Sequence, residues 1–164
     1  MQVVRLLILL SYCDILNGMC EWDKQGVLMQ GYNLIVVFNK EEDRMLMRKR
    51  LKEPYLGLSN FVGGKIETNE NGLDAAYREL FEESAIGRED IILTHLMDFT
   101  YHLDNCYVEV YVGKLNKDVN VSGTENTLYW SDLNHNFFDP SLYAGEGNIG
   151  HIMMHVEMFK NILI

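Results

Sequence analysis

The stretch of sequence that decides the fold is residues 64–86, which read GKIETNENGLDAAYRELFEESAI. Most of it has the pattern of an amphipathic helix, which we predict over residues 71–84. Asn71 is a suitable N-cap, and Asp74 stands three residues later, in the position that a capping box requires. Apolar and small side chains repeat at helical spacing and form the predicted buried stripe: Leu73, Ala76, Tyr77, Leu80 and Ser84.

The opposite face of this predicted helix carries Glu79, Glu82 and Glu83 at i, i+3 and i+4. Like charges at this spacing destabilise a helix by about 0.2–0.5 kcal/mol per pair, so another interaction must compensate. One compensation is an exposed acidic face on which Arg78 pairs with Glu82. The other is a hard divalent cation, because Mg²⁺ prefers oxygen ligands and clustered carboxylates supply several of them. The three glutamates alone leave both interpretations open.

The pattern outside this stretch predicts a single α/β domain. Strands are predicted at residues 32–39, 45–50, 91–102, 107–115 and 128–130, and an amphipathic C-terminal helix is predicted over residues 149–159. We assign residues 29–164 to this domain. Residues 1–28 are predicted to be an N-terminal extension, either an extra amphipathic element or sequence upstream of a natural start at Met29. The second interpretation is favoured, because the first strand begins only three residues after Met29.

The spacing of polar residues in residues 64–86 resembles the signature box of the Nudix hydrolases. That box reads Gly, five residues, Glu, seven residues, Arg-Glu-aliphatic, any residue, Glu-Glu, any residue, Gly and an aliphatic residue. The matching positions are Gly64, Glu70, Arg78, Glu79, Leu80, Glu82, Glu83 and Ile86. Ala85 departs from the pattern, because it stands where the box has glycine. If that position needs a positive φ, alanine costs about 1 kcal/mol there. The alternative is that Gly87, two residues on, ends the helix instead.

The resemblance implies the Nudix α/β/α sandwich, a mixed sheet with the box helix and a C-terminal helix. It also implies hydrolysis of a nucleoside diphosphate linked to another group, with Mg²⁺, or alternatively Mn²⁺, as the cofactor. The expected metal ligands are Glu79, Glu82, Glu83 and the carbonyl of Gly63, and the expected supporting residues are Glu70, Gly64 and Arg78. The arginine would fix the orientation of the carboxylates through its bidentate fork.

Four further residues are candidates for catalysis or phosphate binding. In several members of the family the general base is a glutamate from a loop after the box, a place that Glu125 occupies, with Glu146 as the reserve. Glu125 fits an ordinary loop glutamate equally well. Lys65 and Arg50 are expected to reach a phosphate, although a solvated turn lysine explains Lys65 equally well.

Two asparagines suggest how a base is read. Asn60 resembles the asparagine that contacts the base in oxidised-purine triphosphatases of the family, and an amide offers both a donor and an acceptor. Asn148 resembles a second such asparagine, although an N-cap role explains it better. Together they favour a nucleoside triphosphate such as 8-oxo-dGTP. ADP-ribose, another nucleotide sugar or a dinucleotide is the alternative, and a non-catalytic nucleotide-binding module is the third, which the intact carboxylate set argues against.

Charge and cysteine content limit the partners and the compartment. Among 164 residues, acids outnumber bases 24 to 14, the net charge is −10, and no run of Lys or Arg offsets it, so nucleic acid is not expected as a partner. The apolar run at residues 3–10 is far shorter than the roughly 20 residues that a membrane span needs. Cys13, Cys20 and Cys106 have no paired spacing, which indicates free thiols and a cytoplasmic protein. A homodimer stays open.

Overall fold

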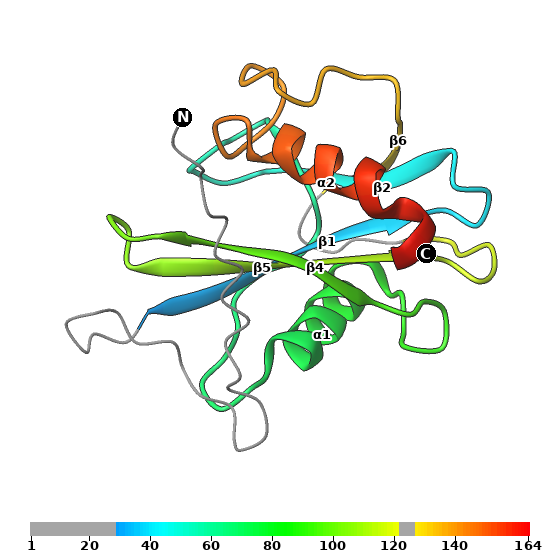
Figure 1. The fold of residues 1–164 in the computed structure, drawn as a ribbon, viewed down its shortest axis with the longest axis horizontal. Coiled ribbons are helices and arrows are strands. Elements are labelled where there is room, and N and C mark those ends of the chain that lie inside the picture. Colours follow the sequence, from blue (N-terminus) through cyan, green and yellow to red (C-terminus); the bar gives the residue numbers. More distant parts are fainter. Residues whose placement is uncertain (1–28, 122–126) are drawn as a thin grey trace, which may run out of the picture.

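The computed structural model describes residues 29–121 and 127–164. Within these ranges the elements are β1 (Gln30–Phe38), β2 (Arg44–Lys49), β3 (Ser59–Asn60), α1 (Gly72–Ser84), β4 (Thr94–Tyr101), β5 (Cys106–Lys114), β6 (Thr127–Asp132) and α2 (Asn148–Leu163), as Figure 1 shows. The predicted extension at residues 1–28 and the candidate base Glu125 lie outside the described residues. Cys106 is a free thiol.

The strands form one mixed sheet in the order β3-β2-β1-β5-β4, and β6 also pairs with β2. β1 and β5 run parallel and in register from Gln30 opposite Cys106 to Phe38 opposite Lys114. Strands in a parallel pair are covered on both faces, which explains why β1 reads as an almost continuous apolar run. Ile35 and the next three residues of β1 are all at most 1% exposed.

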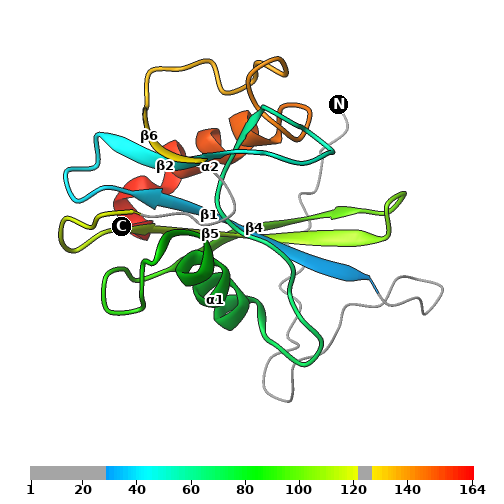
Figure 2. The same ribbon diagram turned by 180° about the vertical axis from the view of Figure 1, so that it is seen from behind.

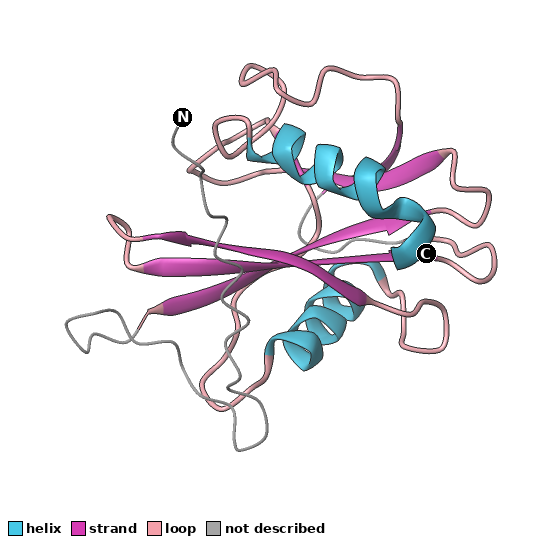
Figure 3. Ribbon diagram, viewed as in Figure 1, coloured by secondary structure: helices cyan, strands magenta, loops and turns pink. Residues whose placement is uncertain are grey.

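The two helices cover opposite faces of this sheet, as Figures 2 and 3 show from opposite sides. α1 closes a core against β1 and β5 that contains Ile35, Val37, Leu80 and Ile86. α2 closes the core of the other face, against β4 and β5. The predicted α/β/α sandwich is therefore confirmed. In the described part of the chain, neither helix is long and apolar enough to cross a membrane.

The predicted strands and helices are present, although several bounds differ; α2, for example, runs to Leu163 and not to residue 159. β4 begins at Thr94 and not at residue 91, because Ile91 forms only an isolated bridge with Leu115. β3 is absent from the prediction, since two residues are too short to show an alternating pattern. This short strand pairs with the end of β2 and leads the chain into the Gly63-Gly64 turn.

α1 begins as predicted, because the side chain of Asn71 accepts the backbone N–H of Asp74 at 2.9 Å. The predicted buried stripe is wrong at Leu73, which is 38% exposed, whereas Ala75 is fully buried. The reason is a third cluster of side chains beside the first turn of the helix, formed by Met29, Ile66, Ala75 and Tyr107. Packing against this cluster, and not only against the sheet, rotates the buried face of the first turn.

α1 ends at Ala85, which has a left-handed conformation with φ 61° and ψ 18°. Its N–H donates to the carbonyl of Phe81 at 2.8 Å and closes the helix. The position where the box has glycine therefore does need a positive φ, and the expectation that Gly87 would end the helix instead is wrong. An alanine in this conformation costs roughly 1 kcal/mol relative to glycine.

Candidate active site

The Gly63-Gly64 turn lies between β1 and the end of α1. The N–H of Gly63 donates to Oε2 of Glu83 at 3.0 Å, and the N–H of Gly64 donates to Oδ1 of Asn33 at 3.2 Å. Gly63 has φ 137°, and a Cβ on it would lie 2.3 Å from the carbonyl oxygen of Asn33. A Cβ on Gly64 would lie 2.3 Å from the carboxyl carbon of Glu79. Only glycines allow this close approach of turn, strand and carboxylate.

Glu83 projects from α1 into the protein and not into solvent. Its side chain is 12% exposed and forms an ion pair with Arg48 on β2, whose side chain is 10% exposed. Burial raises the pKa of the Glu83 carboxyl, and the nearby charge of Glu79 raises it further. The charge of Arg48 and the N–H of Gly63 act in the opposite direction. Glu83 is thus a partly desolvated carboxylate beside a second carboxylate.

Arg78 connects the other glutamates of the box. Its Nε and Nη2 donate to the two carboxylate oxygens of Glu70 at 3.0 and 2.8 Å, which is a bidentate pair. Its Nη1 donates to Glu79 at 2.7 Å and to Glu82 at 3.2 Å. The hydrogen bond with Glu70, followed by that with Glu79, raises the pKa of Arg78. The hydrogen bond from Arg78 in turn lowers the pKa of Glu70. The network fixes the orientation of Glu79 and explains how the helix tolerates its acidic face.

A groove runs from these carboxylates across the sheet. Its carboxylate end is lined by Arg48, Arg50, Gly63, Gly64, Lys65, Glu79 and Glu83, with Leu51, Lys52 and Glu67 at the rim. Its other end, which we call the aromatic hollow, has a volume of about 430 Å³ and is lined by residues that include Tyr32, Tyr55, Phe99, Tyr101, Asn60, Asn148 and Glu146. Arg48, Arg50, Gly63 and Gly64 line both ends, so the two hollows adjoin, and we call them together the groove.

The two asparagines predicted to read a base both line the aromatic hollow. Oδ1 of Asn60 accepts the N–H of Phe61 at 2.8 Å. Asn148 is the first residue of α2, and its side chain donates to the hydroxyl of Tyr101. The N-cap is Gly147, whose positive φ of 95° starts the helix, so the N-cap interpretation of Asn148 is wrong.

The candidate phosphate-binding residues and the candidate general base Glu146 occupy different parts of the groove. Arg50 lines both ends and donates from Nε to the carbonyl of Pro54 at 2.8 Å, while the exposed Lys65 lines only the carboxylate end. Glu146 lines the aromatic hollow and accepts the hydroxyl of Tyr55 at 2.8 Å. Burial and this carboxylate raise the pKa of Tyr55 to about 12.

Arg48 and Asn33 are two charged or polar groove residues that the sequence prediction missed, together with the aromatic residues Tyr32, Phe99 and Tyr101. Residues 48 and 50 are both arginine at the end of an apolar strand, and the two-residue period of a strand places both on one face. That signal could have identified Arg48. Burial lowers the pKa of Arg50, and the nearby positive charge of Arg48 lowers it further. No comparable signal marks Asn33, since a lone polar residue in an apolar strand fits several roles.

The oxygen atoms at the carboxylate end suit a hard divalent cation. Glu79 and Glu83 share this end with the Gly63 carbonyl, whereas the side chain of Glu82 is 57% exposed and lies outside the lining. Among residues 29–121 and 127–164, no three acidic, histidine or cysteine side chains are gathered as a metal centre. Arginines hold the glutamates instead, and a cation would replace part of these ion pairs.

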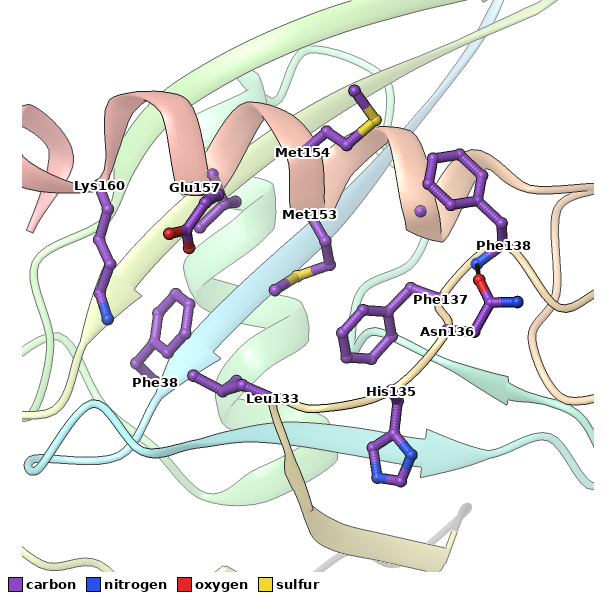
Figure 4. Close-up of a pocket in the computed structure, with 12 residues that line it drawn as sticks. Phe38, Leu133, His135, Asn136, Phe137, Phe138, Met153, Met154, Glu157 and Lys160 are labelled. Carbon is purple, nitrogen blue, oxygen red and sulfur yellow. Dashed lines mark hydrogen bonds between the residues drawn. The ribbon is translucent and has the colours of Figure 1, made fainter.

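A separate hollow lies between α2 and the loop after β6 (Figure 4). Phe38, Phe137 and Met153 form its apolar floor, and Lys160 lies over the ring of Phe38 at 5.1 Å. Glu157 is the one carboxylate in the lining of this hollow. The hollow shares no lining residue with the groove. The arginines and the box carboxylates that line the groove are therefore not part of this hollow.

Comparison with known proteins agrees with this geometry. The family model of the NUDIX domain matches residues 29–134, while a search of curated proteins found no match. Among solved structures, a MutT studied from Aliivibrio salmonicida and Vibrio cholerae is 20% identical, with a TM-score of 0.58 over 79% of this chain and 98% of that one. An Ap4A hydrolase of C. elegans is 19% identical, with a TM-score of 0.62 over 80% and 98% of the two chains.

The NUDIX domain of Shewanella oneidensis NrtR, solved with ADP ribose, is 15% identical, with a TM-score of 0.62 over 83% of this chain and 91% of that one. The TM-scores of these structures show a shared fold, and the family model covers well over half of the chain. The chain belongs to the NUDIX domain family and is a Nudix hydrolase.

Proposed function

We propose that this Nudix hydrolase cleaves a nucleoside triphosphate, such as 8-oxo-dGTP, to a nucleoside monophosphate and pyrophosphate. The observation that supports this proposal is that the two ends of the groove adjoin. One end offers carboxylates and arginines, and the other offers aromatic rings with two amides. A nucleotide has the same division into a charged phosphate chain and a flat base. A protein with a net charge of −10 needs local positive charge to hold such an anion.

The residues of the carboxylate end would hold Mg²⁺, or alternatively Mn²⁺. Glu79, Glu83 and the carbonyl of Gly63 are the proposed ligands, with Glu82 joining from the rim. A bound ion would supply positive charge for the phosphate oxygens and would lower the pKa of a water that it holds. Arg78 keeps Glu79 oriented through its hydrogen bonds, and Glu70 holds Arg78 in turn.

The remaining candidates divide between phosphate binding and proton transfer. Arg50 and Lys65 are proposed to bind phosphate oxygens, because both line the carboxylate end. Glu125 is proposed as the general base. Glu146 is better placed to bind the nucleobase than to act as the general base, because it lines the aromatic hollow and accepts a hydrogen bond from Tyr55. In that hollow the base would stack on aromatic rings, with Asn60 and Asn148 within its outline.

The alternative substrate is ADP-ribose, another nucleotide sugar or a dinucleotide. The openness of the carboxylate end favours it, because Leu51, Lys52 and Glu67 at the rim are exposed and leave room for a group larger than phosphate. The solved structures with a similar fold include an Ap4A hydrolase and a NUDIX domain bound to ADP ribose.

Products separate these possibilities. The protein is incubated with Mg²⁺ and 8-oxo-dGTP, dGTP, ADP-ribose or diadenosine tetraphosphate, and the products are resolved by anion-exchange chromatography. Release of monophosphate and pyrophosphate from 8-oxo-dGTP at the highest kcat/KM supports the proposal. Faster cleavage of ADP-ribose to two monophosphates would establish the alternative. Binding of a nucleotide without any cleavage would indicate a non-catalytic module.

A further inference from the structure

Two nitrogen donors in the described part of the chain are buried in the groove without a hydrogen-bond partner. They are Nδ2 of Asn33 and Nε of Arg48, on residues that are 1% and 8% exposed. Both residues line the aromatic hollow. The buried Oδ1 of Asp90 lies outside the groove and is different, because Nζ of Lys117 pairs with it at 2.5 Å. A buried donor without a partner costs about 1–3 kcal/mol, and such atoms are rare in native proteins.

The remaining polar atoms of the two side chains hold them in place. Oδ1 of Asn33 accepts the N–H of Gly64, so the amide cannot turn without losing this bond. The guanidinium of Arg48 pairs with Glu83, and Glu83 in turn accepts the N–H of Gly63. Each side chain is thus anchored beside the Gly63-Gly64 turn and leaves one N–H unused. That turn lies where the two ends of the groove meet.

The missing partner has a defined chemistry. Both unused atoms are N–H donors, so the group that satisfies them must be an acceptor. Arg48 brings positive charge, and Arg50 adds a second guanidinium along the same wall. An anionic oxygen gains most from such donors, because charge-assisted hydrogen bonds are about twice as strong as neutral ones.

We infer that Asn33 and Arg48 form a subsite for the phosphate that is attached directly to the nucleoside. This inference rests on the proposed function. With the base in the aromatic hollow and the distal phosphates at the carboxylate end, this phosphate lies at the meeting point of the two ends. Arg48 then joins substrate binding to Glu83, because its guanidinium contacts both. Asn33 and Arg48 are substrate-binding residues in this arrangement.

Two conservative variants remove one donor each. Asn33→Asp keeps the shape and the oxygen that accepts the Gly64 N–H, but it replaces Nδ2 with an acceptor. Arg48→Lys keeps a positive charge for Glu83 and removes Nε. The matched control is Arg44→Lys, on the same strand, because Arg44 is exposed, pairs with Asp132 at 3.8 Å and lies outside the groove.

The measurement is calorimetric binding without metal, using the pairs dGMP and deoxyguanosine, and AMP and adenosine. For the pair that the wild type prefers, each variant is expected to weaken monophosphate binding by about tenfold or more. Nucleoside binding is expected to stay unchanged, since it lacks the phosphate. Arg44→Lys is expected to match the wild type for both ligands. Thermal unfolding checks that each variant is folded. Arg48→Lys, which keeps the net charge, decides the question, because the negative charge added by Asn33→Asp would by itself weaken phosphate binding.

Unchanged monophosphate binding in a folded variant would overturn the subsite, as would an equal loss for monophosphate and nucleoside, which indicates a structural role. In both cases wild-type cleavage of nucleotides would leave the proposed function intact. A wild type that neither binds nor cleaves any of the nucleotides would instead refute the proposed function and the subsite with it.

Discussion

The guanidinium of Arg48 and the carboxylate of Glu83 form a buried ion pair that joins β2 to α1 across 35 residues of sequence. Both charges lose most of their hydration there, which their mutual attraction must offset. Removing one partner of such a pair leaves the other charge buried and uncompensated, which costs more than the pair itself contributes. Any change at Glu83 therefore acts on the strand that carries Arg48 as well as on the helix.

Glu83→Gln is expected to lower kcat by about a thousandfold or more, because it removes a proposed metal ligand. It is also expected to lower the free energy of unfolding by about 1–3 kcal/mol, because Arg48 is left as a buried charge without its partner. This loss outweighs the gain from removing the desolvated carboxylate, whose pKa burial raises. The helix pattern alone gives the opposite sign for stability, because a like-charge repulsion of only about 0.2–0.5 kcal/mol disappears. Steady-state kinetics and urea denaturation measure both effects. The exposed Glu157→Gln on α2 serves as control, and unchanged stability of Glu83→Gln would contradict the buried pair.

Removal of divalent metal is expected to abolish turnover and leave the protein folded. The arginine partners of Glu79 and Glu83 keep both carboxylates compensated without a cation. Activity on 8-oxo-dGTP is measured in excess chelator and after Mg²⁺ or Mn²⁺ is restored, and circular dichroism monitors the fold. Full activity in chelator would remove the metal assignment, and loss of the fold would show that the carboxylate end needs the ion for stability.

Ala85→Gly is expected to stabilise the protein by about 0.5–1 kcal/mol. The left-handed conformation of Ala85 strains a residue with a Cβ, and glycine relieves that strain at the cost of a more flexible unfolded chain. Thermal unfolding should show a rise in Tm of about 2 °C. The control is Ala75→Gly in the interior of the same helix, where glycine is expected to cost about 1 kcal/mol or more. Destabilisation by both variants would contradict the strain at Ala85.

A chain that begins at Met29 is expected to fold and turn over substrate like the full chain. The side chain of Met29 is 5% exposed and packs with Ile66, Ala75 and Tyr107, and Gln30 donates to the carbonyl of Ile66 at 3.2 Å. A second variant that begins at Tyr32 loses both contacts and is expected to be about 1.5–3 kcal/mol less stable. An insoluble or inactive Met29 variant would show that residues 1–28 are part of the domain.

The sequence predicted what depends on local spacing. The N-cap at Asn71, the period of α1 and the apolar run of β1 depend on neighbours along the chain, and the structure has each of them. The stripe failed at Leu73 because the cluster around Met29 and Tyr107 comes from distant segments. The sequence pattern favours Asn148 as the N-cap of α2, because asparagine is a common cap. The pattern cannot show that Gly147 takes a positive φ and is itself the cap.

The groove shows the same division. The glutamates of the box were found because one helix carries them at fixed offsets. Arg48 and Asn33 were not found, because their roles arise only when the pairing of strands and the Gly63-Gly64 turn bring them beside Glu83. A partner 35 residues away leaves no periodic trace in the sequence.

Asn60 is the residue expected to select the base. Asn60 lies on β3, where it pairs opposite Arg48 of β2, and it lines the aromatic hollow. Its amide is therefore at the wall that a nucleobase would contact. Oδ1 already accepts the N–H of Phe61, which fixes the orientation of the amide and leaves Nδ2 as the donor. Asn60→Ala is expected to lower kcat/KM for the preferred nucleotide by about tenfold to a hundredfold, the loss of about 1–3 kcal/mol of binding in the transition state.

Nucleotides that are used poorly should lose much less, because they do not make this hydrogen bond well in the wild type. The comparison is kcat/KM of the wild type and Asn60→Ala on 8-oxo-dGTP, dGTP and ADP-ribose. Asn60→Asp is the matched variant, since it keeps the oxygen for Phe61 and removes only the donor. A selective loss for one base in both variants supports base reading by Nδ2. The contrary result is an equal loss of kcat/KM for all three substrates in Asn60→Ala and no loss in Asn60→Asp. It would show that only the hydrogen bond from Phe61 is needed, and that Asn60 shapes the chain before the turn without reading the base.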